Sequence, residues 1–123
     1  MRKPKSKELI WVGSSLEDLQ TFPSKVRQVM GFALYLAQTG EKHPNAKPMK
    51  GFHGAGVLEV VDSFERNTYR TVYTVKLGDE VYVLHAFQKK ATKKIATPKH
   101  DLDLIRQRYE QARKIHGQCV KRR

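Results

Sequence analysis

The run 57–87, VLEVVDSFERNTYRTVYTVKLGDEVYVLHAF, decides the fold class of this chain. It contains three stretches rich in Val, Tyr and Thr, at residues 57–64, 69–76 and 80–87, joined by connectors of four and three residues. Connectors this short join antiparallel neighbours, so the run predicts a three-stranded meander.

The alternation of side chains within the middle stretch predicts how the sheet is buried. Tyr69 and Tyr73 occupy one face of the expected strand together with Val75, whereas Arg70 and Lys76 occupy the other. Because successive side chains of a strand point to opposite faces, we expect one packed face and one more polar face that carries Arg70.

The chain before residue 41 predicts one strand and two helices. The apolar run 8–12 is typical of a strand, and a short helix is expected at 16–21 after a serine cap. Residues 24–37 repeat apolar side chains at three- and four-residue steps, and Gly40 follows them, which predicts a longer helix with one buried stripe.

The two remaining segments predict a loop and a last helix. Residues 42–56 hold two prolines and three glycines without periodicity, so we expect a long loop. Thr97 and Pro98 form a helix start, and apolar residues recur after them until a predicted end near residues 116–117.

These elements predict an α+β fold in which a four-stranded, mainly antiparallel sheet packs against two N-terminal helices, with a C-terminal helix. A length of 123 residues suits one hydrophobic core. We therefore expect a basic flexible lead at 1–7, a single domain at 8–116 and a basic tail at 117–123.

The net charge of +12 is concentrated at the two ends. Residues 1–7 hold four cations and no acid, and residues 89–123 hold twelve cations and three acids. Residues 8–88, with eight cations and nine acids, are nearly neutral. Basic segments of this kind favour a polyanionic partner, either nucleic acid or an acidic protein that masks the same surface, over a purely solvated tail.

Composition argues against several classes of protein. Cys119 is the only cysteine, so an intramolecular disulfide and a cysteine-rich zinc site are excluded, and a reducing cytoplasm is the expected location. The histidines lack paired metal-ligand spacing, and there is no phosphate-cradling glycine loop, so neither a metal nor another cofactor is expected. No apolar window reaches the length of a membrane span.

Four strings of the sequence are informative together. The most specific is YVLHAFQKK at residues 82–90, followed by Thr97-Pro98. KPMKG at 47–51, VLE at 57–59 and TYRTVY at 68–73 support it. In these strings the chain resembles the RelE/HigB-type toxins of toxin–antitoxin modules, and most closely the phage-derived, HigB-like branch of the RelE/ParE superfamily. One position departs from the pattern, because many relatives carry arginine where this chain has Val61.

This resemblance implies a RelE-like fold and a ribosome-dependent endoribonuclease that cuts mRNA and inhibits translation. It also implies a cognate antitoxin, expected to be a helix-turn-helix protein, with the ribosome and mRNA as the other partners. Neither a membrane nor a cofactor is implied.

Four residues are candidates for the chemistry. In metal-free RNA cleavage the 2′-OH attacks the adjacent phosphate, so a site must move protons and stabilise extra negative charge. The planar guanidinium of Arg70 suits the phosphate oxygens, although Arg70 pairing with an acid such as Glu59 is the structural alternative. Lys89 and Lys90 are candidates for holding the phosphate or transferring a proton.

His85 is the fourth catalytic candidate. It alternates with Val81, Val83 and Phe87, so a hydrogen-bonded histidine on an apolar face is the competing interpretation. The candidates for binding the RNA backbone form a separate set, which consists of Lys47, Lys50, Lys93 and Lys94.

Two rival functions remain open. A ParE-like relative would inhibit DNA gyrase by binding it, with a shared fold but without phosphate chemistry. A non-catalytic nucleic-acid-binding module is favoured by Val61, which replaces an arginine of many relatives.

Overall fold

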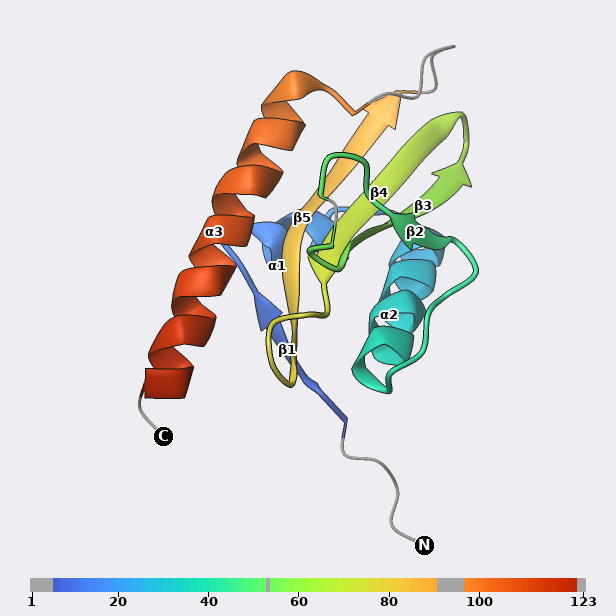
Figure 1. Cartoon of the computed structure of the whole chain (residues 1–123). Coiled ribbons are helices and arrows are strands. Elements are labelled where there is room, and N and C mark those ends of the chain that lie inside the picture. Colours follow the sequence, from blue (N-terminus) through green and yellow to red (C-terminus); the bar gives the residue numbers. More distant parts are fainter. Residues whose placement is uncertain (1–5, 53, 91–96, 122–123) are drawn as a thin grey trace, which may run out of the picture.

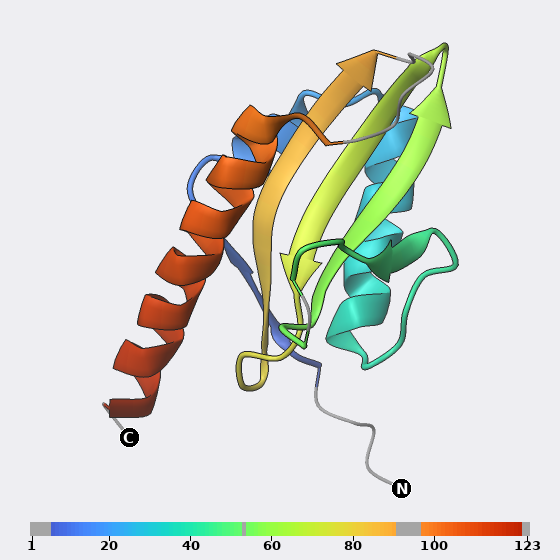
Figure 2. The same ribbon diagram turned by 45° about the horizontal axis from the view of Figure 1, so that its top comes forward.

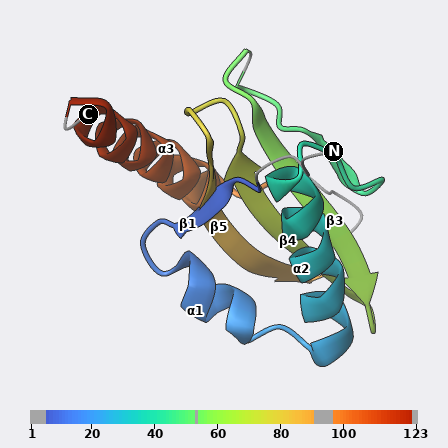
Figure 3. The same ribbon diagram turned by 90° about the horizontal axis from the view of Figure 1, so that it is seen from below.

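The computed structural model describes residues 6–52, 54–90 and 97–121, and it shows a mixed five-stranded sheet with helices on both faces (Figures 1 and 3). The strands are β1 (Glu8–Trp11), β2 (Ala46–Pro48), β3 (Val57–Phe64), β4 (Asn67–Thr74) and β5 (Glu80–Lys90). The helices are α1 (Ser15–Gln20), α2 (Ser24–Gln38) and α3 (Lys99–Lys121). The predicted α+β class is confirmed.

The sheet has the strand order β1-β5-β4-β3-β2, in which only the β1–β5 pair is parallel. The prediction of four strands missed β2, which lies within the expected loop 42–56 and pairs with β3. Three residues carry no detectable period, and β2 contains a proline, which edge strands tolerate. The backbone pairing with β3, rather than the local sequence, makes these three residues a strand.

The predicted meander is present, with a tighter first turn. β3 has the expected bounds, but β4 begins two residues earlier than predicted, and Phe64 pairs with Asn67. The two turn residues, Glu65 and Arg66, both have positive φ values of 48° and 69°, as the two-residue hairpin turn that matches the strand twist requires. β5 extends to Lys90, three residues past its predicted end.

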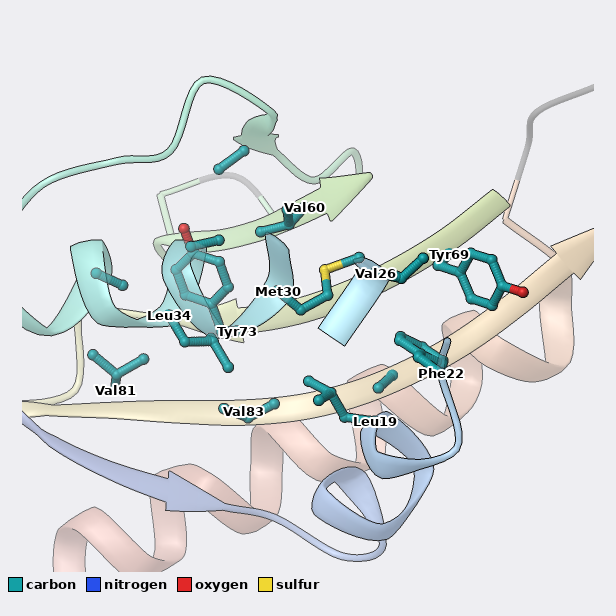
Figure 4. Packing of buried hydrophobic residues seen from close by; sticks show 14 residues of the cluster. Leu19, Phe22, Val26, Met30, Leu34, Val60, Tyr69, Tyr73, Val81 and Val83 are labelled. Atoms are coloured by element: carbon teal, nitrogen blue, oxygen red, sulfur yellow. The ribbon is translucent and has the colours of Figure 1, made fainter. Parts of the chain in front are cut away.

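Both faces of the sheet are buried, which corrects the expectation of one polar face. All residues of β4 from Tyr69 to Thr74 are buried. On one face Val26, Met30 and Leu34 of α2 pack against the strands, and Figure 4 shows Val26 and Met30 beside the tyrosines of β4. On the other face α3 covers a second apolar cluster. This cluster includes Val57, Val72, Tyr82, Leu84, Phe87, Ile105 and Ala112.

A β-bulge moves His85 to the α3 face of the sheet. Val72 of β4 pairs with His85, but the next residue, Tyr73, pairs with Val83, so β5 holds one extra residue at this point. Val83 belongs to the cluster under α2, whereas His85 contacts α3. The predicted common face for His85 and Val83 is therefore wrong, because strict alternation fails at the bulge.

Helix α3 is longer than predicted. It begins after Thr97 and Pro98 as expected, and the amide of Leu102 donates to the Pro98 carbonyl at 3.0 Å. It continues through Gly117 to Lys121, so residues 117–121 of the expected tail are helical. A glycine costs a helix only about 1 kcal/mol, which does not force it to end. None of the described helices has the length and hydropathy to cross a bilayer.

An arginine on α3 fixes the helix to the sheet. Arg108 is 8 % exposed, and its guanidinium donates to the Leu84 carbonyl at 3.0 Å and to the Ser14 hydroxyl at 2.9 Å. Gly13 has a φ of 58°, and a Cβ at this position would lie 2.7 Å from Nε of Arg108. The turn after β1 therefore needs glycine both for its backbone and for the arginine beside it.

Candidate functional site

A cavity of about 760 Å³ lies on the face of the sheet that carries α3. Its lining combines three parts of the chain: Glu59 and Arg70 from the sheet, Lys47 and Lys50 from β2 and the residues after it, and Arg106 from α3. Figure 2 shows α3 and the segment after β2 on the same side of the strands. We call this cavity the basic pocket.

Arg70 and Glu59 form a buried ion pair in the lining of the basic pocket. Nη1 of Arg70 donates to Oε2 of Glu59 at 2.9 Å, and the two residues are 2 % and 7 % exposed. Nζ of Lys47 lies 3.8 Å from the other carboxylate oxygen. The structural alternative for Arg70 is thus present, and the same arginine also lines a cavity that is open to a ligand.

Val61, which stands where many RelE/HigB-type toxins have an arginine, lies beside the basic pocket's Arg70 in the sheet. Val61 is directly across from Arg70 in the β3–β4 register, so an arginine there would lie beside Arg70. Glu59 is two residues before Val61 and shares its face. With valine at this position, Arg70 is the cation that the strands β3 and β4 contribute to the basic pocket.

The basic pocket is strongly cationic. Among the described residues, Lys47, Lys50, Arg70 and Arg106 give the lining four cationic side chains, against the one carboxylate of Glu59. The side chains of Lys47 and Arg106 are more than half exposed, whereas Arg70 is buried. A buried guanidinium surrounded by exposed cations is suited to a phosphate that enters from solvent.

Sequence reasoning missed Arg106. It lies next to Asp103 at 3.9 Å, a spacing that is typical of a solvated helix face. Its guanidinium carbon is also 5.8 Å from the ring centroid of Phe52, and Phe52 meets Tyr109 edge-on at 6.3 Å. The available signal was its place in the sequence between Leu102 and Tyr109, two partly buried residues of the apolar stripe, which puts Arg106 at the border of the packed face.

His85 lies apart from the basic pocket, with both ring nitrogens engaged. Nη1 of Arg108 lies 3.3 Å from Nδ1, and because arginine only donates, Nε2 carries the proton that bonds Asp101 Oδ1 at 2.8 Å. Burial lowers the pKa of His85 below its ordinary 6.5, and Arg108 adds to this effect against the opposing influence of Asp101 and Asp18. The ring also stacks on Phe87 at 4.8 Å.

Of the remaining lysine candidates, the structure describes Lys89 and the backbone of Lys90. Lys89 is half-buried opposite Thr68 in the β4–β5 register, and the backbone of Lys90 is opposite Asn67. Lys89 is not among the residues that line the basic pocket. Lys93 and Lys94 lie outside the described residues.

Comparisons with known proteins place the chain in one family. Neither the curated proteins nor the solved structures contain a significant match. The family model described as "Phage derived protein Gp49-like (DUF891)" matches residues 17–110, well over half of the chain. Members of this family are generally toxins of toxin–antitoxin modules, which have an antitoxin partner. The chain therefore belongs to the Gp49-like family of phage-derived proteins, a family of RelE-like toxins.

Proposed function

We propose that this protein is an endoribonuclease toxin that cuts mRNA on the ribosome, in the manner of HigB-type toxins. The observation that carries the proposal is the basic pocket, which is lined by three exposed cationic side chains together with the buried guanidinium of Arg70. A polyanion with a reactive phosphate is the ligand that this charge arrangement suits best.

The proposed reaction is attack of a ribose 2′-OH on the adjacent phosphate. Arg70 would stabilise the charge that develops on the phosphate oxygens, and the ion pair with Glu59 would fix the orientation of its guanidinium. Among the lining residues Glu59 is the carboxylate that can accept the 2′-OH proton, and Lys47 or Lys50 can donate one to the leaving 5′-oxygen.

The other candidates have supporting roles in this proposal. Lys89, Lys90, Lys93 and Lys94 would contact the RNA backbone or the ribosome. His85 would hold α3 in position through Asp101 and Arg108, since both of its nitrogens already have partners. The proposed neutralising partner is a helix-turn-helix antitoxin, and the proposed site of action is the cytoplasm.

Induction in cells with mapping of mRNA 5′ ends tests the proposal. We expect new 5′ ends at in-frame positions of translated transcripts, and none in a matched transcript whose start codon has been removed. Cuts in both transcripts would contradict ribosome dependence. Intact mRNA with broken DNA would favour a ParE-like gyrase inhibitor, and growth arrest with both nucleic acids intact would favour a non-catalytic binding module.

A further inference from the structure

We propose that a second cavity beside the basic pocket binds an unstacked nucleobase of the RNA, so that the protein reads a base next to the phosphate it cleaves. This cavity, which we call the side pocket, has a volume of about 540 Å³. The inference rests on the proposed function, and it adds a base-binding subsite to it.

The two pockets are neighbours. Pro48, Met49 and Lys50 line both of them, so this segment separates the side pocket from the basic pocket. A nucleotide joins a flat base to an anionic phosphate through one sugar. A ligand that spans Lys50 can therefore place its phosphate in one pocket and its base in the other.

The lining of the side pocket suits a base. Phe52, Leu58 and Val75 give it apolar walls, and the cations Lys50 and Lys76 contribute to its lining, with no acidic residue among the lining residues that the structure describes. Proteins that read single-stranded RNA place splayed bases against aromatic rings and guanidinium planes. The apolar walls can contact the base of a nucleotide and the lysines its phosphate. An inorganic anion would contact only the lysines.

The ring of Phe52 is fixed by two residues of α3. The guanidinium of Arg106 lies over its ring at 5.8 Å, and Tyr109 meets the ring edge-on with an interplanar angle of 72°. Arg106 lines the basic pocket, while Phe52 lines the side pocket. Phe52 and Arg106 thus place an aromatic ring and a cation side by side, one in the lining of each pocket.

Glycine keeps the backbone of the side pocket close to its neighbours. Gly56 has a φ of 67°, and a Cβ there would collide with the side-chain carbons of Lys76. The amine of Lys76 donates to the Gly54 carbonyl at 3.3 Å, and the hydroxyl of Thr74 donates to the Ala55 carbonyl at 3.0 Å. These contacts tie residues 54–55 to β4 and to the residues that follow it, and Gly54, Val75 and Lys76 contribute to the lining.

The test compares binding of a short single-stranded RNA with binding of an abasic ribose-phosphate strand of the same length. We expect Phe52→Leu, which keeps an apolar side chain, to weaken binding of the RNA by about 5- to 150-fold and to leave the abasic strand unchanged. Phe52→Trp is expected to retain binding of the RNA. Phe32→Leu is the matched control, because Phe32 is an exposed aromatic residue on α2, across the sheet.

The outcomes separate this inference from the proposed function. Equal loss for both strands, or unchanged RNA binding by a folded Phe52→Leu protein, would overturn the base pocket. Unchanged RNA binding with loss of antitoxin binding would also overturn it and assign the cavity to the protein partner. If the wild type leaves cellular mRNA intact while the base-dependent difference persists, the nuclease proposal fails and the base pocket stands.

Discussion

Arg70 bonds Glu59 diagonally across the β3–β4 pair, at 2.9 Å, although its direct cross-strand neighbour is Val61. The diagonal pair leaves the carboxylate of Glu59 between Arg70 and Lys47. A guanidinium held in this way has a fixed orientation and little freedom to move toward solvent. This fixed charge is the feature of the basic pocket on which the proposed chemistry depends most.

Replacement of Arg70 is therefore expected to affect both catalysis and stability. We expect Arg70→Ala to slow RNA cleavage by about 10²- to 10³-fold, the scale for loss of one preorganised charge donor. It also leaves Glu59 buried beside the more distant Lys47, so the free energy of unfolding should fall by up to about 3–5 kcal/mol. Cleavage rates on purified ribosomes and urea unfolding measure the two effects separately.

Arg70→Lys is the control that keeps the positive charge but removes the planar guanidinium group. We expect a folded protein that recovers only part of the rate, because an ammonium cannot make the bidentate contact. A folded Arg70→Ala protein that cuts at the wild-type rate would remove Arg70 from the chemistry and leave it a purely structural role.

The salt dependence of RNA binding should report the cations of the basic pocket. If Lys50 and Arg106 each neutralise one phosphate, replacing either by Ala should make the slope of log K against log salt less steep by about 0.7. Lys25→Ala is the matched control, since Lys25 is exposed on α2 on the opposite face of the sheet. If Lys25→Ala changed the slope as much as Lys50→Ala does, RNA would not bind preferentially to the face of the sheet that carries the basic pocket.

Two arginines of α3 should differ sharply in their contribution to stability. Arg108→Ala removes the donor to the buried Leu84 carbonyl and to Ser14, so we expect a loss of about 2–4 kcal/mol in the free energy of unfolding. Arg113 forms only an exposed pair with Glu110 at 3.2 Å, and Arg113→Ala should stay within about 0.5 kcal/mol of the wild type. Urea titration of the two variants decides whether Arg108 is the anchor of the helix.

His85 should make stability depend on pH. Its pKa is lowered in the folded protein, so the unfolded chain binds more protons as the pH drops below about 6.5. Stability is fully present above this pH and is lost as the pH falls toward the lower pKa of the folded state. His85→Gln, whose amide can keep both hydrogen bonds but does not titrate, should reduce this loss. Parallel curves for the two proteins between pH 7.5 and 5.5 would contradict the assignment.

The sequence by itself determined the elements whose signals are local. The three- and four-residue steps of 24–37 predict α2, and the Val-, Tyr- and Thr-rich runs with short connectors predict the meander. Arg70, Lys47 and Lys50, which the structure places in the lining of the basic pocket, are candidates from the sequence alone, and their roles stay predictions. Each of these signals depends on neighbours within about ten residues.

The tertiary structure alone decided what depends on contacts between distant segments. β2 exists because Ala46 pairs with Val60, and Arg106 belongs to the basic pocket because α3 packs across the sheet. The bulge after Val83 turns His85 toward Asp101 of α3. Strict alternation of side chains along β5 would instead place His85 on the face that packs against α2. Burial by both α2 and α3 likewise removed the polar face expected for β4. Packing energy accumulates over a whole interface, so it overrides local preferences of a fraction of a kcal/mol that the sequence pattern displays.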